Sequence, residues 1–367
     1  MTLAIARAIY AFGLLMTGAL MLVVFGPKSE GGQFSDAEKS APSLSPGPGR
    51  DSPASFSQRD DDAFPPTLSK TGYFESVSGY RLNSSFVAFE VNAPYWSDDA
   101  QKLRAVRMPP GIAVKFEANK PWFFPVGTTF VKTFQLSADG ETKRIETRIV
   151  RRAKFGWLFS TYIWNEEQTE AKLEMDGPRF PVTAGHTSQA WGVPHQLDCL
   201  ECHNDKAGRV LGFNLRQLNR VEKTKTGSGN QLHRLQRAGV LRAVPDQLKA
   251  TPSFCSPYDE KADLDDRART YLQVNCSMCH QPGTPQTTQF NLPLDLRRQR
   301  PIYETGLLQL DPNNPTGPPL RPRSLRSTLF LNRVGAIGQF RMPPLGSLMI
   351  DEKAHVMLKK WFARFLN

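Results

Sequence analysis

The chain has 367 residues, with 46 Lys and Arg against 35 Asp and Glu and a net charge of +11. Because domains usually contain about 100–200 residues, this length predicts two or three folded units joined by linkers. The 29 Pro and 27 Gly favour strands and loops over a helical solenoid, and five Cys are too few for a disulfide scaffold. We therefore expect a globular protein of the α+β class.

An apolar stretch without a charged residue occupies positions 8–26. It is long enough to cross a bilayer as a helix, and it exceeds the roughly 7–15 apolar residues of an ordinary signal peptide. No small-residue cleavage site follows it directly. We expect residues 1–26 to be an uncleaved anchor helix that tethers an exported, periplasmic body to the inner membrane. A long cleavable signal peptide is the alternative.

Residues 27–66 are rich in Ser, Pro, Gly and Asp, and we expect them to form a disordered linker. From 67 to 190, short runs of β-branched and aromatic residues alternate with turn sequences at hairpin spacing. These runs lie at 86–91, 112–116, 128–136, 144–151, 157–164 and 171–175. The pattern predicts a β-sandwich-like module over 67–190. Its tryptophans are expected to pack in cores rather than line a ligand cleft: Trp96, Trp122, Trp157 and Trp164.

The first chemical motif is Cys199-Leu-Glu-Cys202-His203, in a segment that we assign to 191–255. Two cysteines three positions apart lie on one helical turn, where both thiols can bind the two vinyl groups of one haem and the adjacent His can bind the iron. Zinc is the rival, but zinc ribbons separate their Cys pairs by roughly 15–20 residues, and the next pair here is much further away. A redox dithiol would need a βαβ setting, which the surrounding sequence does not suggest.

The second motif is Cys276-Ser-Met-Cys279-His280, in a segment that we assign to 256–367. Asp263 is placed to cap a helix that leads into this motif, and Asp351 to cap an amphipathic helix near the C-terminus. Between them, about 60 residues after His280, Met342 lies in a Met-Pro-Pro loop. This order is typical of a class I cytochrome c, with His280 and Met342 as the two axial ligands of the iron.

The sixth ligand of the first iron stays open. His186, His195 and His233 are candidates, and a Met, another residue or no protein ligand are alternatives. The question matters because a five-coordinate haem binds small ligands, whereas a six-coordinate one mainly carries electrons. Cys255 is left over, and we expect it to be a buried free thiol.

Several phrases of the sequence occur together in one known family. They are Glu90-Val-Asn-Ala-Pro-Tyr-Trp-Ser-Asp, Trp122-Phe-Phe-Pro-Val-Gly-Thr-Thr-Phe-Val-Lys-Thr-Phe, Glu146-Thr-Arg, Cys199-Leu-Glu-Cys-His, Ala207-Gly-Arg-Val-Leu-Gly-Phe-Asn-Leu-Arg-Gln-Leu-Asn, Arg267-Ala-Arg-Thr-Tyr-Leu and Met342-Pro-Pro-Leu. Over roughly 68–366 the chain resembles exported bacterial proteins with a β-rich module followed by c-type haem segments, sometimes fused to quinoprotein sugar dehydrogenase-like propellers. The resemblance implies electron transfer. It also implies that a dehydrogenase would be a separate protein, because this sequence has no propeller-like segment.

We therefore expect an exported di-haem c-type cytochrome with two covalently bound haem c groups, an electron carrier rather than a stand-alone enzyme, with no catalytic residue assigned. Its expected partners are redox proteins, such as a separate dehydrogenase and an acidic cytochrome or oxidase, and the membrane through the anchor; nucleic acid is not expected outside the cytoplasm. Basic residues that could dock an acidic partner are Arg297, Arg298, Arg300, Arg321, Arg323, Arg326, Arg333 and Arg341. The alternatives are a haem enzyme (a peroxidase or dehydrogenase subunit) that uses an open first haem, and a carbohydrate- or partner-binding module with redox-sensing haems.

Overall fold

The computed structural model describes residues 63–118, 122–224, 227–248, 252–281, 284 and 329–364. The expected anchor and most of the expected linker lie outside these residues. Within the described ranges, no helix has the length and apolar character needed to span a membrane. The stretch Ser57–Asn367 groups into one compact unit, so the β-rich part and both motif segments belong to the same body.

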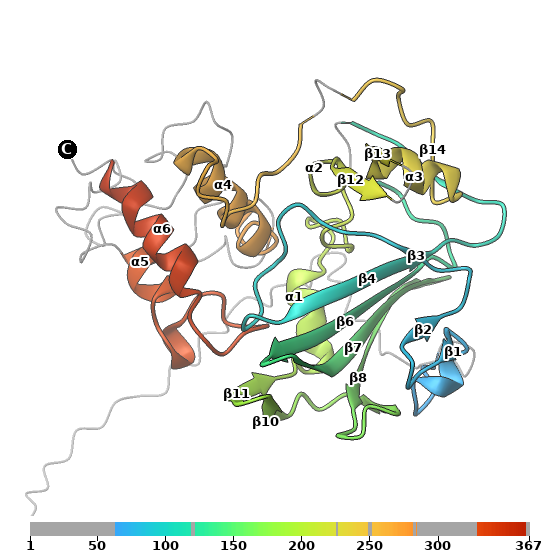
Figure 1. The fold of residues 1–367 in the computed structure, drawn as a ribbon, viewed down its shortest axis with the longest axis horizontal. Helices are drawn as coiled ribbons and strands as arrows, with labels where there is room; N and C mark the ends of the chain where they lie inside the picture. The colour runs from blue at the N-terminus through green and yellow to red at the C-terminus, as the bar shows by residue number, and fades with distance from the viewer. Residues whose placement is uncertain are drawn as a thin grey trace, which may run out of the picture. The chain divides into compact units, whose positions relative to one another are not determined.

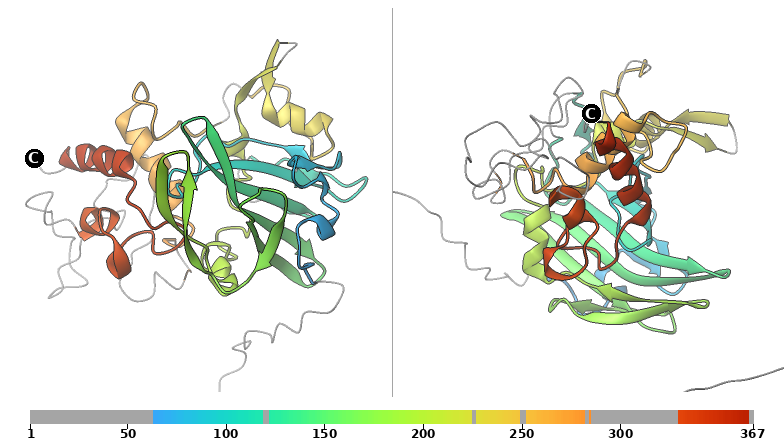
Figure 2. Two further views of the ribbon diagram at one scale, coloured as in Figure 1. Left: turned by 60° about the horizontal axis from the view of Figure 1, so that its bottom comes forward. Right: turned by 90° about the vertical axis from the view of Figure 1, so that its left-hand side faces the viewer.

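A six-stranded antiparallel sheet is the centre of this body, with strand order β3-β4-β6-β7-β8-β9 (Figure 1). Its strands are β3 (Val87–Ala88), β4 (Gln101–Arg107), β6 (Thr129–Ala138), β7 (Glu141–Ala153), β8 (Gly156–Trp164) and β9 (Ala171–Glu174). The longest strands twist strongly along their length (Figure 2). The expectation of a β-rich module is confirmed, and four of its predicted runs become β6 to β9.

The turn between β6 and β7 explains how two such long strands can pair. Asp139 and Gly140 both have positive φ angles, 54° and 83°. A two-residue turn of this kind matches the right-handed twist of the strands that it joins. The long β6–β7 hairpin is therefore specified locally by an Asp-Gly pair between two β-rich runs.

Two-stranded pairs surround the large sheet. They are β1 (Phe74–Ser76) with β2 (Arg81–Leu82), β10 (Arg179–Ala184) with β11 (Thr187–Gly192), β12 (Val221–Thr224) with β13 (Gly227–Asn230), and β5 (Val114–Lys115) with β14 (Leu241–Arg242). The β10–β11 ribbon packs on β6 and β7, where the ring of Trp191 lies 5.8 Å from that of Phe134. Within the described residues, the second layer at this end of the sheet is thus a short ribbon rather than a second sheet of equal size.

The two faces of the large sheet bury different sets of side chains. On one face, Val131, Ile149 and Tyr162 pack against residues from the start of the described chain. Phe64, which lies inside the range expected to be linker, belongs to this core and is 8% exposed. The folded part of the chain therefore begins before residue 67.

The opposite face of the sheet is covered at one end by the segment that follows the first motif. Phe213 packs between Phe89 and Phe130, with ring centroids 4.9 Å and 5.3 Å away. Trp122 joins this cluster and Trp164 lies in the core of the other face; both are buried, so packing is confirmed for these two. The sheet and the first motif segment consequently share a core.

The remaining elements are short helices and two longer ones. The short ones are η2 (Ser69–Thr71), η3 (Gln196–Asp198), α1 (Cys199–Cys202), α2 (Leu215–Leu218), α3 (Gln231–Arg237), α5 (Leu329–Val334) and η7 (Gly338–Phe340). The longer ones are α4 (Leu264–Asn275) and α6 (Glu352–Ala363), which pack against each other.

Both longer helices begin at the residues that the sequence indicates. The Asp263 carboxylate accepts hydrogen bonds from the first backbone N–H groups of α4, and that of Asp351 accepts one from Ala354 N. The indole N–H of Trp361 donates a 2.8 Å hydrogen bond to Asp265, which joins the buried face of α6 to the first turn of α4. This helix pair, with α5, forms the separate apolar cluster in the C-terminal part of the chain.

Candidate functional site

The first C-x-x-C-H motif is held on the central sheet by the turn that precedes it. The side chain of Gln196, in η3, donates a 3.1 Å hydrogen bond to the carbonyl of Phe159 on β8. Cys199 and Cys202 then begin and end the single turn of α1. Both cysteines line a cavity of about 1070 Å³ between this turn and the inner face of the sheet. This volume lies just above the ~300–1000 Å³ typical of ligand pockets and suits a cofactor-sized group.

His203 is oriented so that one ring nitrogen is free. Its Nδ1 lies 2.6 Å from the carbonyl oxygen of Arg209. Since a carbonyl can only accept, Nδ1 carries the proton and Nε2 keeps its lone pair. Burial and the nearby charge of Lys132 lower the pKa of His203 to about 3, so the ring is neutral. A neutral imidazole with a fixed tautomer is the form that ligates metals.

The second motif follows the C-terminus of α4. Cys276 is the C-cap residue of this helix and packs against the α4–α6 cluster. The preceding residue, Asn275, accepts a 2.9 Å hydrogen bond from the backbone N–H of Trp96, which links the motif to the β-rich part. Burial and the charge of Arg333 lower the pKa of His280, so this imidazole is also favoured in its neutral form.

The fold brings the two motifs into contact. Cys279 Sγ lies 3.4 Å from the carbonyl oxygen of Glu201, and Asn204 Nδ2 donates a 2.8 Å hydrogen bond to the carbonyl of Met278. The thiols of Cys202 and Cys279 are hydrogen-bonded, which lowers the pKa of Cys202 and raises that of Cys279. More than 70 residues of intervening chain hide this contact from sequence reasoning.

The zinc alternative can be tested on this geometry, because all four motif cysteines and both motif histidines belong to the described residues. A tetrahedral site needs three or four ligand atoms close together. Among the described His, Cys, Asp and Glu side chains, the group of three or more that comes this close is Asp263, Asp265 and Asp266 at the N-terminus of α4. No three ligand atoms of the motif cysteines and histidines come within this distance of one another in the described part of the chain.

Met342 lies close to the second motif. Its side chain packs, half-buried, against the same α4–α6 cluster as Cys276. Its backbone N–H donates a 2.8 Å hydrogen bond to the carbonyl of Arg333, the residue whose charge acts on His280. Met342 is thus hydrogen-bonded to the residue whose charge acts on His280.

One of the eight arginines expected to form a basic docking surface, Arg341, is buried. Arg341 is 6% exposed, and its guanidinium donates hydrogen bonds to the Pro343 carbonyl and to Ser347. It braces the loop that carries Met342 and does not belong to a docking surface. The other members of the cluster, apart from the half-buried Arg333, lie outside the described residues.

None of the three histidines proposed as sixth ligand lines the cavity beside His203. His186 is exposed on the β10–β11 hairpin, His195 is exposed and caps η3 through its side chain, and His233 Nε2 lies 2.8 Å from the Pro245 carbonyl. Met278 and Tyr95 do line the cavity. Cys255 is half-buried, with Sγ 3.7 Å from the hydroxyl of Thr270.

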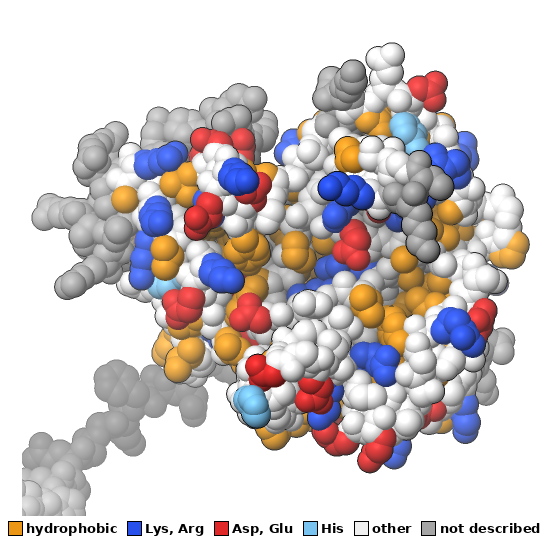
Figure 3. Space-filling model, viewed as in Figure 1, with side chains coloured by type: hydrophobic (Ala, Val, Ile, Leu, Met, Phe, Trp, Pro, Cys, Tyr) orange, Lys and Arg blue, Asp and Glu red, His pale blue; other side chains and the backbone are white. Residues whose placement is uncertain are grey.

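The cavity wall on the sheet side is strongly cationic, which the sequence analysis missed. It contains Lys102, Arg104, Lys132 and Arg148, from strands β4, β6 and β7. Lys and Arg side chains are visible beside hydrophobic ones in the hollow of the face shown in Figure 3. Lys132 lies between Phe130 and Phe134 on a face of β6 that is otherwise apolar, and this alternation was the available sequence signal.

These residues fit a haem c group. Two thiols on one turn, a neutral His with a free Nε2 and a cavity of cofactor size meet the covalent and axial requirements. The cationic wall could pair with carboxylate substituents. Comparison of the chain with family models, curated proteins and solved structures finds no match.

Proposed function

We propose that this protein is an exported di-haem c-type cytochrome that transfers electrons between redox partners in the periplasm or at the membrane. The observation that carries the proposal is the contact between the two C-x-x-C-H segments, in which Cys279 Sγ lies 3.4 Å from the Glu201 carbonyl oxygen. Cofactors attached at segments this close are neighbours, and closeness favours electron exchange between them. When bound, each haem iron supplies a reversible one-electron carrier.

At the first motif, Cys199 and Cys202 would hold one haem covalently and His203 would ligate its iron through Nε2. The Arg209 carbonyl fixes the tautomer that makes this possible, since its 2.6 Å contact keeps the proton on Nδ1. A histidine hydrogen-bonded in this way is also a better ligand, because the bond increases its basicity.

At the second motif, Cys276 and Cys279 would hold the other haem, with His280 and Met342 as axial ligands in a class I-like cytochrome c domain. The packed helix pair α4 and α6 supports this reading, as does the position of Met342 beside Arg333. A methionine ligand tends to raise the reduction potential, so the second haem is the proposed exit for electrons.

The proposed partners are redox proteins, namely a separate dehydrogenase and an acidic cytochrome or oxidase. The membrane would be reached through the segment 1–26, whose charge-free apolar stretch supports an inner-membrane anchor.

The test is the haem content of the full chain, exported in a host with c-type maturation and measured as pyridine haemochrome. We expect two haems per chain. The double variants Cys199→Ala/Cys202→Ala and Cys276→Ala/Cys279→Ala should each retain one. Met342→Ala should remove the charge-transfer band that reports a Met sulfur on ferric haem. A haem-free wild-type chain would refute the proposal.

A second function is favoured by the cavity. None of the three candidate histidines lines it beside His203, whereas Met278 and Tyr95 do. If neither of these side chains ligates the iron, the first haem would have an open face and could act in a haem enzyme, such as a peroxidase or dehydrogenase subunit. A high-spin ferric spectrum that shifts on addition of cyanide, together with reaction with peroxide, would support this function. A low-spin first haem that is inert to both would exclude it.

A further inference from the structure

Three cations face one another directly across three neighbouring strands of the central sheet. Arg104 on β4 is opposite Lys132 on β6, and Lys132 is opposite Arg148 on β7. We call these three residues the cationic row. Directly opposed residues of an antiparallel sheet point to the same face, and like charges in such positions repel each other. An arrangement of this kind inside a cavity needs compensation.

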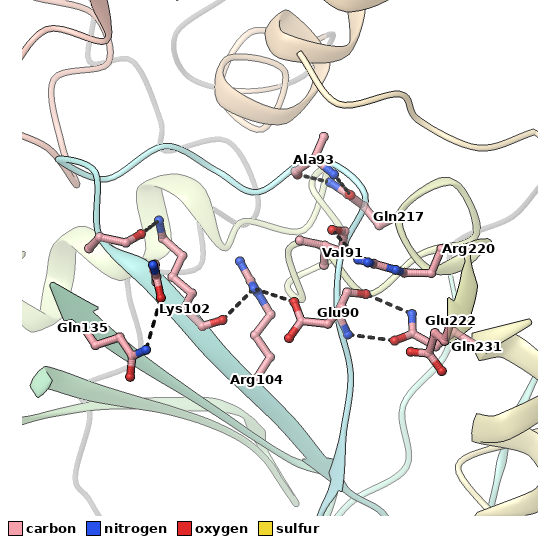
Figure 4. A network of polar contacts seen from close by, with 12 residues as sticks. Glu90, Val91, Ala93, Lys102, Arg104, Gln135, Gln217, Arg220, Glu222 and Gln231 are labelled. Atoms are coloured by element: carbon pink, nitrogen blue, oxygen red, sulfur yellow. Dashed lines mark hydrogen bonds and ion pairs between the residues drawn. The ribbon is translucent and has the colours of Figure 1, made fainter. Parts of the chain in front are cut away.

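The protein's own acids compensate the cationic row only in part. Glu146, which is fully buried, forms an ion pair with Arg148. Arg104 lies 3.9 Å from the carboxylate of Glu90, whose side chain is 56% exposed. Figure 4 shows Glu90 reaching toward Arg104 from the segment that follows β3. The Lys132 ammonium forms neither an ion pair nor a hydrogen bond among the described residues, and burial next to Arg148 and Arg104 lowers its pKa to about 7, although the charge of Glu146 acts in the opposite direction. One buried carboxylate, Glu146, thus serves both Lys132 and Arg148, and Arg104 has only a peripheral counter-ion.

An aromatic ring supplies some further compensation. Lys132 Nζ lies 5.1 Å and the Arg148 guanidinium carbon 4.6 Å from the centre of the Phe134 ring. Lys102 lies on the same face of β4 as Arg104, and its Nζ is 5.4 Å from the centre of that ring. Three cations share this one ring, and a ring quadrupole attracts cations without carrying a net negative charge. The ring therefore does not replace the missing anion.

The cationic row lies beside the first motif. Its three members line the same cavity as Cys199, Cys202 and His203. The charges of Lys132 and Arg148 also act on His203 and on both cysteines. Any group attached at the first motif thus meets the cationic row across the cavity.

We propose that the cationic row is a binding site for a carboxylate-type anion beside the first haem, with Lys132 as its central donor. This inference rests on the proposed haem attachment at Cys199 and Cys202. Two sources can supply the same chemistry: the propionate groups of the first haem, or a free small anion that enters the cavity. A charged donor flanked by two guanidinium groups suits either source, because charge-assisted hydrogen bonds to such anions are strong.

The test uses the full-length holoprotein and Lys132→Met, which keeps the side-chain length and leaves no buried acid unpaired. Lys172→Met is the matched control, because Lys172 is an exposed lysine on β9 of the same sheet. Lys132→Arg should restore the wild-type behaviour. Haem content is measured on every sample, so that failure of the proposed function can be told from failure of the anion site. A wild-type chain without haem at the first motif refutes the proposed function.

Two measurements on these samples distinguish the sources. If the anion is free, azide and nitrite titrated into the ferric protein should bind about tenfold more weakly to Lys132→Met, with the neutral ligand imidazole unaffected. If the anion is a propionate, these titrations should leave the variant and wild type alike, and Lys132→Met should shift the carboxylate bands of the redox-induced infrared difference spectrum. Normal haem content without a change in either measurement would overturn the anion site.

Discussion

The side-chain amide of Asn204 donates a 2.8 Å hydrogen bond to the main-chain carbonyl of Met278 and thereby joins the residue after the first motif to the inside of the second. The same Nδ2 donates to the Glu201 carbonyl at 3.0 Å, while Oδ1 accepts from the backbone N–H of Ala207 at 2.8 Å. One amide thus closes the turn after His203 and ties it to the other motif. Together with the contact between Cys279 Sγ and the Glu201 carbonyl, this bridge joins the two motifs.

Asn204→Asp separates these two roles, because a carboxylate can still accept from Ala207 but cannot donate to Met278 or Glu201. We expect a loss of about 1 kcal/mol for each hydrogen bond removed and a weaker magnetic interaction between the two ferric haems in electron paramagnetic resonance. Haem content should stay at two per chain. An unchanged interaction in Asn204→Asp would mean that other contacts keep the motifs together.

The stability of the chain without haem should depend on Lys132 in a defined pH range. Its pKa is lowered from 10.5 to about 7 in the folded state. Between these values the unfolded chain binds a proton that the folded chain has lost, so the free energy of unfolding rises as the pH is raised. One pKa unit corresponds to about 1.4 kcal/mol, which sets an upper limit of roughly 5 kcal/mol for the rise between the two pKa values.

Denaturant unfolding of chains produced without haem attachment, at pH 7 and pH 10, measures this effect. Lys132→Met should be more stable than wild type at pH 7 and should lose most of the rise, whereas Lys172→Met should retain it. Equal pH dependence in wild type and Lys132→Met would show that the Lys132 ammonium is not desolvated in the folded chain.

The sequence predicts the local parts of this structure well, because they depend on neighbours in the chain. Alternating β-rich runs and the Asp139-Gly140 turn give the hairpins, and Asp263 and Asp351 begin helices where their side chains can accept from the first turn. Strand β4 is missed because its residues, Gln101–Arg107, are mostly polar. A mostly polar sequence of this kind is typical of a surface segment, and only the structure shows that Lys102 and Arg104 line a cavity.

The contact between the motifs and the cationic row could not be predicted in the same way. Each depends on which strands are neighbours, and the pairing of Arg104 with Lys132 crosses a long connection. The pairing of β14 with β5 is a further example, because these strands come from segments more than 100 residues apart. Spacing arguments identify chemical groups along the chain, whereas only the fold decides which of them share a cavity.

Asp351 is expected to stabilise the C-terminal helix pair through two contacts. Its carboxylate caps α6 at Ala354 N, 3.0 Å away, and accepts a 2.5 Å hydrogen bond from the hydroxyl of Tyr258. Asp351→Ala removes both and should lower the free energy of unfolding by about 2 kcal/mol. Asp351→Asn keeps a capping oxygen and should lose clearly less. Chemical denaturation followed by tryptophan fluorescence would measure both variants, and equal losses would show that the cap contributes little.

Gly177 fixes the path of the chain into the first motif. It has a φ angle of +70°, and a Cβ added there would lie 2.6 Å from the backbone nitrogen and 2.9 Å from Cα of His195. These are backbone atoms of His195, the N-cap residue of η3, so the clash cannot be relieved by rotating a side chain. Gly177→Ala should therefore displace the turn that delivers Cys199, in addition to the roughly 1–2 kcal/mol cost of a left-handed conformation for alanine.

Gly111→Ala is the matched control, because Gly111 has a similar φ angle of +74° but nothing within 4 Å of an added Cβ. Both variants should be destabilised by the backbone term, and Gly177→Ala by more. With maturation, we expect haem loss from the first motif in Gly177→Ala alone, seen as fewer than two haems per chain while the Met342-dependent band persists. If Gly177→Ala and Gly111→Ala have equal stability and haem content, the position of η3 does not limit attachment at Cys199, and the turn around Gly177 is not what places the first motif over the cavity.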